Sequence, residues 1–235
     1  MTPSFWWIVP AAGIGARMGA DLPKQYLELA GKPVLAHTLE RLLAVPGWRG
    51  LVLALSEDDR WWEGLPQAAH PGVIRCCGGR ERGDSVLNAL RVLDGRAKER
   101  DWVLVHDAAR PCLRVRDVQR LLAALADDPV GGLLATPVRD TMKRADAEGR
   151  VAATVPREAL WHALTPQMFR YGVLREALES AAQAGAGVTD EASAIERLGG
   201  RPRLIEGHDD NIKVTRPGDL WLARVFLQAQ SEEGA

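Results

Sequence analysis

Short apolar runs alternate with longer amphipathic stretches over the first half of the chain, and this alternation limits the folds open to it. The runs have the length of strands, and the first, second and fourth are almost entirely apolar, as in strands that helices cover on both faces. They lie at residues 5–9, 51–55, 73–76, 102–105 and 132–136. Apolar residues recur with a helical period at residues 34–45, 85–93 and 118–125. This order predicts an α/β fold with a mainly parallel, twisted sheet flanked by helices.

The alternation is interrupted between residues 139 and 157. This stretch is polar and carries a turn signal at Ala147-Glu148-Gly149, and it has too little apolar content for a core of its own. It predicts a projecting β-arm that packs on another surface, most simply on a second copy of the chain. Helical patterns return at 168–182, 191–198 and 217–228, with a strand pattern at 203–206. We expect a single domain over residues 1–235 that contains a dimerisation arm at 139–157.

Charge and composition argue against several classes of function. Thirty Lys and Arg residues stand against thirty-one Asp and Glu residues, so bulk charge gives no reason to expect nucleic acid or an anionic membrane as partner. No apolar run approaches the roughly 18 residues of a transmembrane helix, and the N-terminus lacks the basic start of a signal peptide. Cys76, Cys77 and Cys112 match no metal-binding or redox spacing. We therefore expect reduced thiols in a cytoplasmic protein.

A glycine-rich loop follows the first predicted strand. Gly13, Gly15 and Gly19 allow a tight bend and a close approach of the backbone to a ligand. Successive N–H groups in such a loop can bind phosphate oxygens. Arg17 and Lys24 place two cations on the same connection. The loop therefore indicates a phosphate-binding site.

Other interpretations of this loop differ in how well they fit. A Walker A motif is excluded, because the Gly-Lys-Ser/Thr ending is missing. A dinucleotide-binding loop needs a third glycine where Met18 stands, although Ser56-Glu57-Asp58 could supply its acidic residue. A plain turn between strand and helix also remains open, but it leaves the paired cations unexplained.

Six segments of the chain form a recognisable series. They read PAAGIGARMG with PKQY, HDAARP, PVRDTMKR, TPQ, TDEAS and DNIKVTRP, and they cover residues 8 to about 220. In this order they closely resemble the 2-C-methyl-D-erythritol 4-phosphate cytidylyltransferase family. The resemblance implies a Rossmann-like nucleotidyltransferase fold, a homodimer with arm exchange, and a Mg²⁺-dependent reaction. In that reaction, CTP and the erythritol phosphate give the CDP-linked alcohol and pyrophosphate.

The chemistry of such a reaction sets the demands on the site. The attacking phosphate oxygen is already ionised at neutral pH, so no general base is needed. The obstacle is repulsion between two anions, roughly 4 kcal/mol for two unit charges about 4 Å apart at an effective dielectric of about 20. The site must therefore supply fixed cations and hold the reactants in line.

The resemblance assigns the catalytic residues by position. Arg17 and Lys24 match residues that stabilise charge on the α-phosphate and the departing pyrophosphate. Lys213, in the last motif, matches a position beside the α-phosphate and the incoming substrate. Arg157, just past the arm, matches an arginine that holds the substrate phosphate. These four residues are the expected catalytic set.

Substrate-binding positions follow in the same way. Family members place the threonine and arginine of the arm in the neighbouring subunit's site, here Thr141 and Arg157, and an arginine can grip a phosphate bidentately. Arg110 and Thr189 match further substrate-side positions. Asp107 follows an apolar run, so it should lie at the carboxyl end of a strand, where open α/β sheets bind ligands. We assign it to Mg²⁺ or to the substrate diol.

Nucleotide contacts are expected from two loops and one residue after a strand. Backbone amides of a Gly-Gly turn can read the edge of a base at close range. The matching positions are Pro10, Ala11, Ala12, Gly13, Gly15, Gly78, Gly79, Ser85 and Ala108. Arg80, beside the turn, stands where relatives can carry an acidic or small residue, so its role stays open.

His106 and the tryptophans are interpreted as structural. Trp6, Trp102 and Trp161 lie in strand-like or apolar surroundings and are expected in the core. Without a basic stripe beside them, stacking on nucleic acid is not expected.

Three alternatives compete with the cytidylyltransferase. A related enzyme could load another phosphate-bearing alcohol or sugar onto CTP or another nucleotide. A binding module would bind a nucleotide without chemistry. An NAD-dependent oxidoreductase would bind NAD and not CTP.

Overall fold

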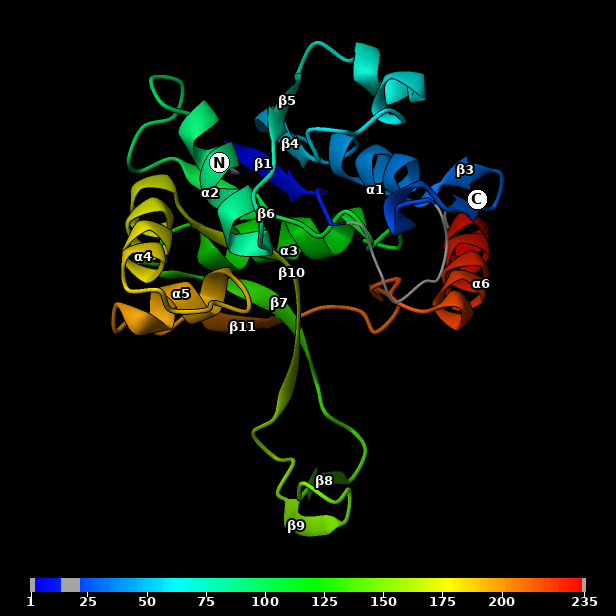
Figure 1. Cartoon of the computed structure of the whole chain (residues 1–235), viewed down its shortest axis with the longest axis vertical. Coiled ribbons are helices and arrows are strands. Elements are labelled where there is room, and N and C mark those ends of the chain that lie inside the picture. The colour runs from blue at the N-terminus through cyan, green and yellow to red at the C-terminus, as the bar shows by residue number, and fades with distance from the viewer. Residues whose placement is uncertain (1–2, 14–21, 234–235) are drawn as a thin grey trace.

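A seven-stranded sheet forms the centre of the computed structural model, which describes residues 3–13 and 22–233 (Figure 1). Neighbouring strands are parallel, except that β10 runs antiparallel to both of its neighbours. The mainly parallel sheet expected from the sequence is confirmed. In spatial order the strands are β11 (Arg203–Glu206), β7 (Gly131–Pro137), β10 (Trp161–Arg170), β6 (Trp102–Val105), β1 (Phe5–Pro10), β4 (Trp48–Leu55) and β5 (Val73–Cys77).

Helices cover both faces of the sheet. Helices α1 (Val34–Leu43) and α3 (Val115–Leu125) pack on one face, and α2 (Arg82–Val92), α4 (Tyr171–Gln183) and α5 (Glu191–Arg197) pack on the other. Side chains alternate between the two cores along each strand, so Trp7 belongs to the first cluster and its neighbour Trp6 to the second. This two-faced burial explains why the strands are almost continuously apolar.

Strand β10 corrects the expected helix at 168–182. Residues 168–170 are its last part, where Met168 pairs with Leu104 on one side and Gly132 on the other, and α4 begins only at Tyr171. Two or three apolar residues cannot distinguish a period of 2 from 3.6, so pairing with two neighbouring strands decides the structure. Trp161 was also misplaced in the core, since it is 37% exposed at the outer end of β10.

The predicted arm is a two-stranded hairpin that projects from the sheet (Figure 1). Its strands are β8 (Met142–Ala145) and β9 (Val151–Val155), which pair antiparallel. Gly149 has a φ of 78° at the turn, a left-handed conformation that glycine adopts without strain. Most arm side chains are exposed, including Val151 at 66%. The arm thus makes no core of its own.

The C-terminal helix α6 (Pro217–Glu233) supports the segment that precedes it. Ala223 and Leu227 pack with Val214 and with Leu29 of the small hairpin formed by β2 (Glu28–Leu29) and β3 (Lys32–Pro33). The Val214 N–H donates to the Ala109 carbonyl at 2.8 Å. This bond joins the segment after Asn211 to the loop after β6. Among the described residues, no helix combines the length and apolar character needed to span a membrane.

Candidate active site

A cleft of about 210 Å³ opens at the carboxyl ends of β1 and β6, beside the first turn of α2. Open α/β sheets bind ligands at this edge. Segments far apart in the sequence form its walls, and most of the nucleotide positions expected from the sequence are among them. The lining residues are Pro10, Ala11, Ala12, Gly13, Lys24, Gln25, Gly79, Arg80, Glu81, Arg82, Ser85, Asp107, Ala108, Ala109 and Lys213.

The Gly78-Gly79 turn packs directly against the loop after β1. Both amides already donate within the chain, Gly78 to the Leu55 carbonyl at 2.7 Å and Gly79 to Ser85 Oγ at 2.9 Å, so they are not free to read a base edge as expected from the sequence. A Cβ at Gly78 would lie 2.3 Å from the Cβ of Ala12, and one at Gly79 would meet α2 at 2.1 Å. Only glycine therefore permits this close packing of the turn against Ala12 and α2.

Asp107 lies at the centre of a cluster of cations. Its Oδ2 is 2.9 Å from Lys213 Nζ and 3.3 Å from Arg110 Nε, and its Oδ1 is 3.0 Å from Arg82 Nε. Burial alone would raise the pKa of Asp107, but Arg82, Lys213 and Arg110 together lower it far below its usual range. The carboxylate is therefore ionised at every physiological pH.

A buried network stands behind Asp107. His106 Nε2 lies 3.1 Å from the Arg110 carbonyl, and its Nδ1 lies 2.9 Å from Thr165 Oγ1, which also accepts the Asp107 N–H at 3.2 Å. Asn211 donates to the Thr165 carbonyl at 2.7 Å. Burial is the main cause that lowers the pKa of His106 to about 4. The imidazole is neutral at pH 7, in agreement with its interpretation as structural.

This buried histidine predicts a pH dependence of stability. The pKa of His106 is lower in the folded chain than its ordinary value of 6.5, so the unfolded chain binds its proton first as the pH falls. The contribution is therefore complete above about pH 6.5 and is lost towards pH 4, amounting to about 2 kcal/mol between pH 7 and pH 5. Urea unfolding of wild type and His106→Gln, measured at several pH values in this range, gives the free energy of unfolding at each pH. This free energy should fall less steeply with decreasing pH in the variant than in wild type. Equal slopes in both proteins would contradict the assignment.

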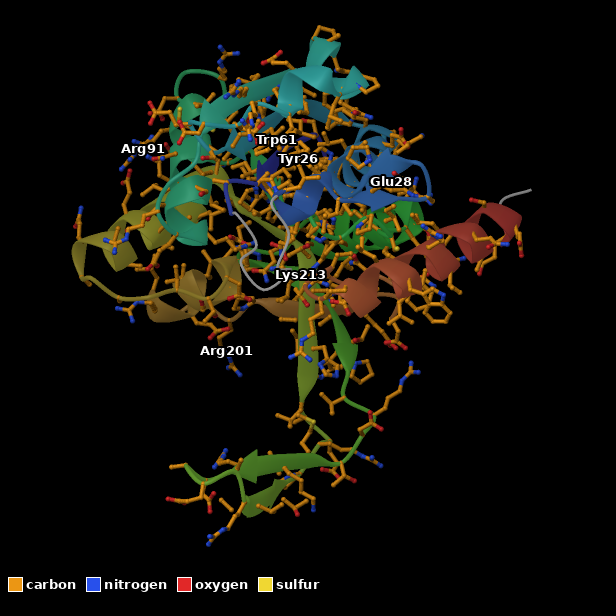
Figure 2. All side chains as sticks on the ribbon, turned by 45° about the vertical axis from the view of Figure 1, so that its right-hand side comes forward. Tyr26, Glu28, Trp61, Arg91, Arg201 and Lys213 are labelled. Atoms are coloured by element: carbon orange, nitrogen blue, oxygen red, sulfur yellow. The ribbon has the colours of Figure 1, made fainter. Side chains whose placement is uncertain are left out.

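Lys24 and Gln25 lie on a short 3₁₀ turn, Lys24–Tyr26, at the entrance of the cleft. Gln25 is buried and donates to the Ala11 carbonyl at 2.7 Å, which ties the turn to the loop after β1. Lys24 Nζ donates to the Val214 carbonyl at 3.3 Å, next to Lys213. The two lysines thus reach the cleft from opposite ends of the sequence. Figure 2 shows Lys213 where the body of the molecule meets the base of the arm.

Some expected site residues lie apart from the cleft. Thr141 and Arg157 are exposed at the arm, and Arg157 donates to the Arg139 carbonyl. Thr189 is exposed just before α5, with its hydroxyl 3.4 Å from Ser193 Oγ.

Arg110 is buried behind Asp107, where it also donates to the Asn211 carbonyl at 2.7 Å. Gly15 and Arg17 lie outside the described residues.

The sequence interpretation did not single out Arg82 or Gln25, although both line the cleft. Arg82 stands in the segment after the Gly-Gly turn, and its second ion-pair partner, Glu191, lies in the TDEAS motif. Both motifs were recognised, but nothing in either shows that they meet.

A larger cavity of about 900 Å³ lies near the start of β6, at the opposite end of that strand from Asp107. Charges of both signs line it, including Arg100, Asp127 and Arg170. Neither its position in the sheet nor its mixed charge favours a nucleotide. The smaller cleft is the better candidate.

The fold and the cleft define an α/β protein of the nucleotidyltransferase type, with a glycine turn and two lysines at the carboxyl edge of a mainly parallel sheet. The family profile of 2-C-methyl-D-erythritol 4-phosphate cytidylyltransferase matches residues 5–229. The chain belongs to this family. An enzyme of that name from Pseudomonas putida (strain GB-1) is 60% identical over 222 residues, covering 94% of each chain. Its namesake from Pseudomonas aeruginosa (strain UCBPP-PA14) is 57% identical over 219 residues, 93% of this chain and 94% of the relative.

Solved structures agree with this assignment. The Francisella tularensis enzyme of the same name superimposes with a TM-score of 0.83 at 36% identity, covering 95% of this chain and 99% of that one. The Thermus thermophilus enzyme gives 0.78 at 31% identity, covering 96% and 99%. The reaction of the family transfers CMP from CTP to 2-C-methyl-D-erythritol 4-phosphate. The chain is a cytidylyltransferase of isoprenoid biosynthesis.

Proposed function

We propose that this chain makes 4-diphosphocytidyl-2-C-methyl-D-erythritol and pyrophosphate by in-line attack of the substrate phosphate on the α-phosphorus of CTP. The convergence of Lys24, Lys213 and Gly79, the second residue of the glycine turn, on one cleft carries the proposal. In this assignment the turn and residues 10–13 receive the nucleotide. Lys24 neutralises the triphosphate, and Lys213 stabilises charge on the α-phosphate as the second anion approaches.

Arg17, Gly15 and Ala108 complete the proposed nucleotide side, and Arg110, Asp107 and Thr189 the acceptor side. Asp107 would hold the acceptor diol or Mg²⁺. Both oxygens of Asp107 also face Arg82, Arg110 or Lys213, so Mg²⁺ at this position would be held mainly by phosphate oxygens of CTP and by waters, of which this ion keeps several. Residues 3–13 and 22–233 contain no group of three or more acidic, His or Cys side chains that could hold a metal by themselves. When bound, Mg²⁺ would neutralise phosphate charge.

The arm is proposed to act in a homodimer. Thr141 and Arg157 are exposed and lie outside the cleft of their own chain, which supports a role in the cleft of a second copy. There Arg157 would hold the acceptor phosphate bidentately. The arm at 139–157 would then belong to a single domain over residues 1–235. A cytoplasmic location fits the three free cysteines.

Pyrophosphate release from a panel of nucleotides and acceptors tests the proposed reaction. CTP with the erythritol phosphate should be the preferred pair. A clear preference for UTP or for a sugar 1-phosphate would favour the related enzyme instead. Nucleotide affinity without any product would indicate a binding module, and calorimetric binding of NAD but not CTP would indicate an oxidoreductase.

The glycine turn offers a direct test of the nucleotide side. Gly78→Ala is expected to weaken CTP binding about tenfold or more, because the new methyl group must displace Ala12 from the wall of the cleft. Isothermal titration calorimetry with CTP measures the change. The matched control is Gly64→Ala, where an added Cβ meets no atom within 4 Å and binding should stay unchanged. Normal CTP affinity in Gly78→Ala would remove this turn from the site.

A further inference from the structure

Arg82 joins three elements of the fold at the floor of the cleft. It is the first residue of α2, and its Nε donates to Asp107 Oδ1 after β6 at 3.0 Å. Its two terminal nitrogens donate to Glu191, the first residue of α5, at 2.6 and 3.0 Å. One guanidinium therefore binds two carboxylates, using three of its five N–H donors.

Burial makes this bridge energetically significant. The side chain of Glu191 is 1% exposed and that of Asp107 is 8% exposed, whereas Arg82 is 25% exposed towards the cleft that it lines. A buried carboxylate that loses its cation costs far more than an exposed one. Burial alone would lower the pKa of Arg82, but Glu191 and Asp107 raise it above its ordinary range, so the guanidinium keeps its charge.

The charges of the cluster do not cancel. Arg82, Arg110 and Lys213 carry three positive charges, and Asp107 and Glu191 carry two negative charges. One positive charge is left over in this cluster. Lys213 is the residue best placed to offer this charge to a ligand, because its side chain is 36% exposed. Arg82 and Arg110 instead donate to buried acceptors, Glu191 and the Asn211 carbonyl.

Asp107 divides its two oxygens between these cations. Oδ1 faces Arg82, and Oδ2 is shared by Lys213 and Arg110. If Lys213 turns towards a phosphate, Arg82 and Arg110 still neutralise the carboxylate and keep its orientation. Without Arg82, Asp107 would keep Arg110 and Lys213 as its cations, and its stronger hold on the ammonium would keep Lys213 back from the phosphate.

We propose that Arg82 is a positioning residue, which fixes Asp107 through the bridge to Glu191 and thereby frees Lys213 for the reacting phosphates. This inference rests on the roles proposed above for Asp107 and Lys213. Arg82 acts through these two residues and does not itself need to touch either substrate. Its loss should therefore affect turnover more than CTP binding.

The sharpest test replaces both Arg82 and its partner Glu191. Arg82→Gln with Glu191→Gln keeps the net charge of the cluster and leaves no buried carboxylate unpaired, so the chain should fold with a melting temperature close to wild type. We expect kcat to fall about tenfold or more, with the KM for CTP changed less than about threefold. Arg82→Lys provides a second variant and should lose part of the same activity, because an ammonium cannot hold Glu191 bidentately and also reach Asp107 as the guanidinium does.

A matched control and a coupling test distinguish positioning from other roles. Arg91→Gln lies on the same helix, exposed at the outer edge of the molecule (Figure 2), and should leave kcat unchanged. In an Asp107→Asn background, adding the Arg82→Gln/Glu191→Gln pair should lower the single-turnover rate of product formation less than about threefold. The reason is that the effect of Arg82 on the reaction passes through Asp107.

The outcomes separate this inference from the proposed function. The inference is wrong if a folded double variant turns over within about twofold of wild type, or if its full loss persists in the Asp107→Asn background. It is also wrong if the loss falls entirely on the KM for CTP, which would make Arg82 a nucleotide ligand. If Asp107→Asn and Lys213→Ala themselves retain normal turnover, the proposed roles of Asp107 and Lys213 fail together with it.

Discussion

Replacing Lys213 by alanine is expected to lower kcat by about two to three orders of magnitude, because a preorganised charge at the reacting centre is commonly worth about 3 to 4 kcal/mol. The ammonium of Lys213 lies in the cleft, 2.9 Å from Asp107. Lys24 contacts the carbonyl of the next residue, Val214, so it reaches the segment that carries Lys213. Binding energy that appears only as charge develops on the α-phosphate is lost from kcat rather than from KM.

The structure also indicates that this variant should fold. Asp107 keeps Arg82 and Arg110 as partners when Lys213 is removed, so no buried carboxylate is left without a cation. Pyrophosphate release gives kcat, and thermal unfolding shows whether the loss is structural. Lys32→Ala is the matched control, since Lys32 is exposed and pairs with Glu40 at 2.8 Å. Turnover of Lys213→Ala within about threefold of wild type would remove this lysine from the chemistry.

The sequence predicted the sheet well where a segment's own pattern is sufficient. Strands at 51–55 and 102–105 are buried on both faces, so they show as apolar runs whatever their neighbours are. Strand β10 was missed because its identity depends on pairing with β6 and β7, which lie far from it in the chain. The position of Asp107 could be predicted for the opposite reason, since it follows a clear strand at the carboxyl edge.

The cation cluster shows where prediction from motifs ends. Family motifs identified Lys213, Arg110 and Asp107 separately, but Arg82 acquires its place only when residues 82, 107 and 191 meet. No local period or spacing encodes such a meeting. The same limit holds for Thr141 and Arg157, whose proposed target lies on a second copy of the chain.

Mixing two inactive variants should therefore restore activity if the arms cross between subunits. Arg157→Ala alone should mainly raise the KM for the acceptor, because the arm no longer holds the acceptor phosphate. At a low acceptor concentration the rate of this variant is therefore small, and the assay is run there. Lys213→Ala is inactive because it loses the charge that lowers the barrier, so its kcat is small. Each variant keeps the group that the other lacks.

In a mixed dimer with arm exchange, one cleft combines an intact Lys213 with an intact Arg157 from the partner, and the other cleft lacks both. Random reassociation of equal amounts makes about half of the dimers mixed, so about a quarter of all clefts should regain both groups. Activity after mixing should rise to about a quarter of wild type at the same acceptor concentration. If each arm instead served its own cleft, every cleft would still carry one lesion and mixing would restore nothing. Refolding the two variants together, compared with refolding each alone, ensures that subunits exchange. Size-exclusion chromatography of the same samples shows that dimers have formed, so a failure to regain activity in mixed dimers would count against arm exchange.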